Sequence, residues 1–170
     1  MAVVGLQYTA TQAKYIQAKS DQNTALIALN NTSTNPCTFT FGPLVTDLAA
    51  DITHDPLLAT GVYEPGVYCT IGAATTAAVT LSGNGTYIFR IAGALDMVAT
   101  TTLTLTNGAS ACDVFWTPTS ATTLGANSNF IGTIIGSPGI TVGNTVTWTG
   151  RALASNYTVT TDTDTITVPT

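Results

Sequence analysis

Residues 114–154 read VFWTPTSATTLGANSNFIGTIIGSPGITVGNTVTWTGRALA, and one pattern of short alternating segments recurs within them. Segments that begin at Val114, Thr133 and Arg151 align with one another at steps of 19 and 18 residues. A further segment aligns from Tyr87, 27 residues before Val114, so we expect that coil to carry an insertion. Fixed repeats of alternating polar and apolar residues, punctuated by glycine, are typical of stacked β-solenoid coils.

A period of 18 to 19 residues has room for three short strands and their corners, with neighbouring coils about 4.8 Å apart. We therefore predict a mainly β fold, a parallel β-helix of triangular section. Residues that alternate along a strand point to opposite faces, so each coil is half core and half outward surface. The expected inward ladders are Leu124, Val142 and Val159 on one strand, and Ile135 and Leu153 on another. The expected outward column between them is Thr123, Thr141 and Thr158.

The composition agrees with this pattern and excludes several classes of protein. Threonine occupies 36 of the 170 positions, whereas charged residues make up 8% and the net charge is −5. Four cationic residues cannot form a phosphate-neutralising surface, so we expect no nucleic-acid partner. No apolar run reaches the roughly 18 residues of a membrane helix, and the 45% apolar content argues against disorder.

The first third of the chain differs from the rest. Residues 9–30 are rich in helix formers, with a weak apolar stripe through Ala13, Ile16 and Ile27, so we predict a helix that lies along a larger body. We assign residues 1–170 to a single domain, with a connector at 31–60 and β-helix coils at 61–170.

The cysteines and the single histidine suggest structural rather than chemical roles. Cys37 and Cys69 are the favoured disulfide, because that bond would tie the segment after the helix to the first coil. Cys112 lies in an apolar run and is expected to be a buried small hydrophobe. We predict no metal site and no cofactor, since no CxxC spacing occurs and His54 has no evident ligand partner in the sequence.

The chain resembles the β-helical ice-binding-protein-like family over residues 60–168, and more loosely over the helix. The resemblance rests on motifs that occur in the family's order and spacing. These are 64–68 (EPGVY), 86–93 (TYIFRIAG), 103–109 (LTLTNGA), 113–116 (DVFW), 123–125 (TLG), 130–135 (FIGTII), 139–142 (GITV) and 150–154 (GRALA).

The resemblance implies a right-handed β-helix with one long α-helix alongside, and adsorption to ice through one flat face. Family members usually carry N-terminal β segments before the helix, whereas this chain starts almost directly at the helix. We therefore expect one end of the solenoid to be bare, or to be capped by residues 32–60. We also expect a secreted or cell-surface location, although residues 1–6 do not form a signal peptide.

Ice binding requires a flat, rigid array of regularly spaced hydroxyl and methyl groups, which outward threonines on stacked strands provide. The first candidate face is Thr123, Asn127, Thr141, Thr145 and Thr158. The second candidate face is Thr104, Thr147, Thr149, Thr165 and Thr167. Asp96 would interrupt the first column. The competing explanation is that threonine is favoured on any exposed β surface.

An alternative function is a structural or adhesive surface module, with self-association through an open solenoid end into a filament. We reject an enzyme. Asp162 and Asp164 form the only close acidic pair in the late part of the sequence, and they fit a solvated strand edge better than a catalytic or calcium site. Trp116 and Trp148 are assigned to the core, and Arg151 to hydrogen bonds with loop carbonyls at a corner.

Overall fold

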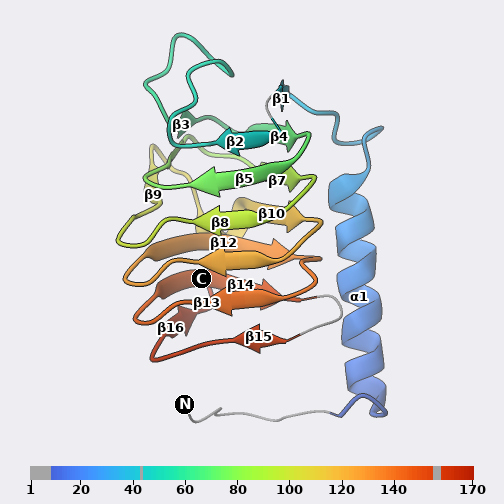
Figure 1. Ribbon diagram of the computed structural model, residues 1–170. Helices are drawn as coiled ribbons and strands as arrows, with labels where there is room; N and C mark the ends of the chain where they lie inside the picture. Colours follow the sequence, from blue (N-terminus) through green and yellow to red (C-terminus); the bar gives the residue numbers. More distant parts are fainter. Residues whose placement is uncertain (1–8, 43, 155–157) are drawn as a thin grey trace.

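The computed structural model describes residues 9–42, 44–154 and 158–170, which form stacked coils of parallel strands with one helix alongside (Figure 1). The strands belong to three parallel sheets, here named sheets A, B and C. Each coil passes through the sheets in turn, so strands that pair in a sheet come from successive coils. This arrangement confirms the predicted parallel β-helix.

Sheet A consists of β1 (Phe39–Phe41), β4 (Gly66–Thr70), β7 (Tyr87–Ile91), β10 (Val114–Pro118), β12 (Asn129–Ile135), β14 (Thr147–Leu153) and β16 (Thr165–Thr167). Sheet B consists of β2 (Val45–Asp47), β5 (Ala73–Thr76), β8 (Leu95–Met97), β11 (Thr122–Leu124), β13 (Ile140–Val142) and β15 (Val159–Thr160). Sheet C consists of β3 (Val62–Tyr63), β6 (Thr80–Ser82) and β9 (Thr104–Thr106).

Aromatic side chains form a ladder through the core, one above another in successive coils. Phe89 stacks on Trp116 with ring centroids 4.1 Å apart, and Phe130 lies between Trp116 and Trp148 at 5.5 and 5.4 Å. Both indole N–H groups are satisfied, since Trp116 donates to the Ile131 carbonyl and Trp148 to a backbone carbonyl of β12. Both tryptophans are fully buried, which confirms their assignment to the core.

The strand register confirms the repeat and corrects one coil of it. Phe115 pairs with Thr133 and Thr133 with Arg151, so both steps are 18 residues, and Tyr87 pairs with Val114 across the predicted 27-residue coil. The inward pair Ile135–Leu153 is also as predicted.

The last coil deviates from the expected ladder. Val159 pairs with Ile140 and not with Val142, so it does not continue the ladder of Leu124 and Val142. Val159 is also 38% exposed, although its pairing partner Ile140 is buried. The expected inward position of Val159 in that ladder is therefore wrong.

The solenoid begins earlier than predicted. Residues 31–60 were expected to be a connector, but they contain β1 and β2, which are edge strands of sheets A and B. The first coil therefore starts at Phe39 and not at Gly61. Alternation over three residues is too short a signal to identify such strands in the sequence. Cys37 and Cys69 form a disulfide beside the pairing of β1 with β4, which is the bond expected.

The helix α1 (Ala13–Asn30) runs along the stack and is held mainly near its C-terminal end (Figure 1). Arg90 of β7 donates from Nε to the Leu29 carbonyl at 2.9 Å, and cations favour the negative end of the helix dipole. Gln22 donates to the Leu153 carbonyl at 2.7 Å. The expected stripe is wrong, because Ile16 and Ile27 are exposed.

Two other assignments from the sequence also change. Cys112 lies in the short 3-10 helix η1 (Ala111–Asp113) and is exposed, because η1 is part of the insertion on the outside of the coils. Arg151 is exposed as well. Within the described residues, the arginine that bonds backbone carbonyls is Arg90.

Gly150 gives a direct test of how tightly the coils pack. A Cβ atom at this position would lie 1.9 Å from the Gly132 carbonyl oxygen of the preceding coil. We expect Gly150→Ala to lower the free energy of unfolding by about 3 kcal/mol, because backbone in two buried strands would have to separate. Chemical denaturation measures this loss. Gly42→Ala is the matched control, since a Cβ there meets no atom within 4 Å, and an equal loss in both variants would contradict the argument.

Candidate functional site

The outer surface of sheet B carries two straight columns of side chains that run across all of its strands. The central column consists of residues that pair from strand to strand, in order Asp47, Thr75, Asp96, Thr123, Thr141 and Thr160. The flank column lies two residues earlier in each coil and consists of Val45, Ala73, Ala94, Ala121, Gly139 and Thr158. The residues between the columns point inward and form part of the core.

This surface is flat for two reasons. None of the twelve side chains in the two columns is larger than valine, threonine or aspartate, so nothing long projects from the sheet. The strands beneath are held in one register by parallel backbone pairing. Threonine groups therefore repeat at about 4.8 Å along the stack, with stiff χ1 angles that fix each methyl and hydroxyl.

The predicted first candidate face is only partly assembled as expected. Thr123 and Thr141 are paired neighbours in the central column and both are exposed. The residue that continues the column is Thr160, because Thr141 pairs with it. Thr158 was assigned to this column by a two-residue error in the last coil, and it lies instead in the flank column.

Asn127 and Thr145 lie outside both columns. They occupy the corner that follows β11 and β13, where each has a positive φ angle, 56° and 59°. They are exposed and adjoin the end of sheet B without belonging to it.

The second candidate face does not form one continuous surface. Thr147 pairs with Thr165, and Thr149 with Thr167, on the last two strands of sheet A. Thr104 lies on β9 of sheet C and pairs with Thr80. The segment around η1 contacts β12 and β14 and lies between these two groups.

Ile131 shows how the second candidate face is interrupted. It occupies the outward position of β12 that pairs with Thr149, yet it is only 8% exposed. The insertion of the 27-residue coil therefore covers the middle of this side, and sheet B provides the longer uninterrupted surface.

The sequence repeat missed the earlier half of the sheet B surface. Thr75 pairs with Asp96 and Asp47 with Thr75, so both residues belong to the central column. The separations between these residues are 28 and 21, and they do not match the period of 18 to 19. The alternation Ala73–Thr76 is a signal that could have placed Thr75 outward once the coil before Tyr87 was aligned.

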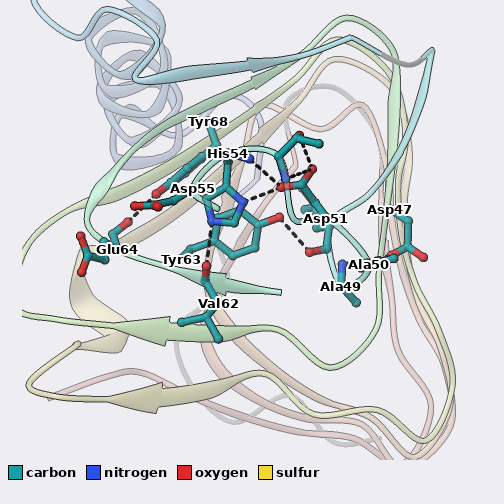
Figure 2. Close-up of polar contacts among 12 residues, drawn as sticks. Asp47, Ala49, Ala50, Asp51, His54, Asp55, Val62, Tyr63, Glu64 and Tyr68 are labelled. Carbon is teal, nitrogen blue, oxygen red and sulfur yellow. Dashed lines mark hydrogen bonds and ion pairs between the residues drawn. The ribbon is translucent and has the colours of Figure 1, made fainter. Parts of the chain in front are cut away.

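A second polar cluster closes the first coil of the solenoid (Figure 2). The side chain of His54 is 2% exposed and stacks on Tyr63 with ring centroids 4.2 Å apart. His54 Nδ1 lies 2.5 Å from a carboxylate oxygen of Asp51, and Nε2 lies 2.7 Å from the Val62 carbonyl. Both ring nitrogens thus face acceptors, which fits an imidazolium paired with a carboxylate. We name this segment, residues 48–63, the end cap.

The end cap is built to be neutral at its centre and closed to water. Tyr63 donates its hydroxyl proton to the Leu48 carbonyl at 2.8 Å, and burial raises the pKa of Tyr63. Tyr68 donates to the Glu64 carbonyl, and burial raises the pKa of Tyr68 to about 12. These hydroxyls stay protonated as donors. The expectation that this end is bare or capped by residues 32–60 resolves in favour of a cap.

The polar residues considered for chemistry have structural contacts instead. His54 has a carboxylate partner that the sequence did not reveal, although Asp51 stands only three positions earlier. Asp164 accepts the amides of Val146 and Asp162, which fits the expected strand edge. In the described part of the chain, no group of three or more His, Cys, Asp or Glu side chains is arranged to hold a metal ion. None of the described helices has the length and apolar character needed to span a membrane.

The fold and the flat face of sheet B define a class, the parallel β-helix with a small-residue, threonine-bearing surface. A family model described as ice-binding-like matches residues 2–167, and the chain belongs to that family. A search of curated protein sequences gave no match.

Solved structures of ice-binding proteins share the fold. The chain is 28% identical to an ice-binding protein from the Antarctic ascomycete Antarctomyces psychrotrophicus, with a TM-score of 0.73 over 92% of this chain and 72% of that one. It is 26% identical to an ice-binding protein domain from Shewanella frigidimarina, with a TM-score of 0.73 over 99% and 69%. An ice-binding protein from an Antarctic bacterium of the Flavobacteriaceae is 27% identical, with a TM-score of 0.77 over 94% of this chain and 36% of that one.

The Asp51–His54 pair predicts a pH-dependent stability. Burial raises the pKa of Asp51, but hydrogen bonds from Thr53 and His54 outweigh it and hold the pKa below the ordinary 3.8. A depressed carboxyl pKa stabilises the fold above the ordinary value, and this contribution is lost as the pH falls through the folded-state pKa. We expect Asp51→Asn to cost about 2 kcal/mol of unfolding free energy at pH 7, the contribution of a charge-assisted hydrogen bond.

Denaturation curves between pH 7 and pH 2 measure this effect. The difference between the wild type and Asp51→Asn should shrink below pH 3.8 as the wild-type carboxylate becomes protonated. Asp96→Asn is the control, because Asp96 is exposed on sheet B and outside the end cap. A difference that stays constant across this range would show that the charge of Asp51 does not contribute.

Proposed function

We propose that this protein adsorbs to ice through the outer surface of sheet B, and that Thr123, Thr141 and Thr160 form the centre of the contact. The observation that carries the proposal is the uninterrupted register of these exposed threonines on a rigid sheet with no long side chain in its two outer columns. Membership of the ice-binding-like family supports ice as the ligand.

The chemistry of the surface suits this ligand. Ice presents a fixed lattice of donors and acceptors, and a protein surface that must match it cannot rearrange without losing order. Parallel pairing fixes the positions of the threonine side chains, and their β-branching restricts the rotation of each. The alanines and Gly139 of the flank column hold water weakly, so little hydration has to be removed when the face meets ice.

A location outside the cell is part of the proposal, because extracellular water is where ice first meets a protein. The Cys37–Cys69 disulfide supports it, since such bonds persist in oxidising compartments. We propose no catalytic role. Self-association through the solenoid ends stays a prediction. The first coil is closed by the end cap, and the last coil exposes Val159 and Ile166 by little more than a third each.

Thr141→Tyr tests the proposed face. A tyrosine ring at the middle of the central column would project above neighbouring threonines and prevent close approach to a flat lattice. We expect the wild type to show thermal hysteresis and to shape growing ice crystals, and the variant to lose most of this activity. Nanolitre osmometry measures both properties.

Thr104→Tyr is the matched control, because Thr104 is an exposed strand threonine on sheet C. It should keep wild-type activity. Loss of activity in Thr104→Tyr with none in Thr141→Tyr would assign the contact to the other side. A wild type that leaves ice crystals round would sink the proposed function.

Asp96→Thr is expected to increase activity. Asp96 separates Thr75 from Thr123 in the central column, and its charge holds water at the middle of the face. Its replacement would join the two threonine groups into one uninterrupted column. We expect a larger thermal hysteresis at equal protein concentration, and unchanged folding by circular dichroism. Asp113→Thr, away from sheet B, should leave the hysteresis unchanged. A decrease in Asp96→Thr would contradict the assigned role of the column.

A further inference from the structure

One corner of the solenoid repeats the same unfavourable backbone conformation in successive coils. A non-glycine residue in the left-handed region occurs at this corner each time. These residues are Thr100 (φ 58°), Asn127 (φ 56°), Thr145 (φ 59°) and Thr163 (φ 48°), here named the corner row.

Backbone hydrogen bonds show that the four positions are equivalent. The amide of Thr100 donates to the residue just before Asn127, at 2.8 Å. The amide of Asn127 donates in the same way to the residue before Thr145, at 2.9 Å, and that of Thr145 to the residue before Thr163, at 3.4 Å. The members of the row therefore lie one above another along the stack.

The backbone does not explain why three of these residues are threonine. Glycine adopts positive φ without strain, and asparagine tolerates it best among the other residues, whereas β-branched residues are strained there. The chain uses glycine where φ is positive elsewhere, as at Gly83 and Gly108, and asparagine at Asn107. The same solutions are open at the corner row, and Asn127 shows that asparagine fits it.

The threonine side chains of the row do little to hold the fold. All are exposed. The Thr100 hydroxyl donates to the carbonyl of the adjacent Ala99, and the Thr145 hydroxyl contacts the side chain of the adjacent Asn144. Thr163 links two coils, since its hydroxyl accepts from the Asn144 amide at 2.7 Å. Strain that is maintained at successive equivalent positions, without a structural benefit to match it, indicates a role for the side chains themselves.

The row adjoins the proposed ice-contacting face. Asn127 follows the last residue of β11 by three positions, and Thr145 follows the last residue of β13 by three. The row therefore runs parallel to the central column, with the same coil spacing, where the chain turns away from sheet B. It presents methyl and hydroxyl groups at the border of the flat surface.

We infer that the corner row is a second line of ice contacts, so that the contacting surface extends over the corner of the solenoid and is not limited to sheet B. This inference rests on the proposed function and adds to it. A surface that bends at a corner can follow an edge between two ice planes as well as a single plane. The strained threonines keep the chemistry of the central column at that edge.

The double variant Thr145→Gly, Thr163→Gly tests this inference, because glycine removes the side chains and relieves the strain. We expect the midpoint of thermal unfolding to stay level or rise, while thermal hysteresis falls about twofold or more, as when contacting side chains are truncated in an interface. Fluorescently labelled protein on a single-crystal ice hemisphere should bind fewer planes than the wild type. Asn107→Gly is the control, since it removes a left-handed asparagine outside the row.

Asn127→Thr provides the opposite change. It completes a row of threonines at the cost of added strain, so we expect higher hysteresis together with a lower unfolding midpoint. Hysteresis that is unchanged in the glycine variant overturns the corner inference alone, provided that Thr141→Tyr has lost activity. A wild type without hysteresis overturns the proposed function and this inference together.

Discussion

Parallel pairing between successive coils is the constraint on which the rest of this structure depends. Every strand of sheets A, B and C obtains its hydrogen bonds from the coils before and after it, so the spacing of the coils is set by backbone geometry. The same spacing orders the aromatic ladder inside and the threonine columns outside. The clash that a Cβ at Gly150 would make with Gly132 shows how closely the coils approach.

A stacked fold of this kind has two exposed ends and tolerates insertions only at its corners. The first end is closed by the end cap, where the buried Asp51–His54 pair and the hydroxyl of Tyr63 satisfy polar groups that no further coil covers. The long insertion leaves the solenoid after β9 and folds back over β12. Because that insertion covers one side and the helix lies along another part of the stack, the surface of sheet B stays open.

The repeat in residues 114–154 was sufficient to predict the class of fold, the buried tryptophans and the pairing of Thr123 with Thr141. It failed where the spacing changed. Thr160 and not Thr158 continues the central column, because the last coil is one residue longer than the coil before it. Asp47 and Thr75 were missed since their coils differ in length from the repeat, and β1 and β2 are too short to show a clear alternation.

The sequence by itself determined that this is an uncharged, threonine-rich β-helix, because a fixed period and an alternating pattern are local properties that folding preserves. Only the tertiary structure decided which threonines share a surface. Whether two side chains are neighbours depends on the length of every corner between them, and one extra residue moves a threonine to another column. The contacts of His54 and the left-handed corner row follow from the same packing of coils, in which local preference yields to register.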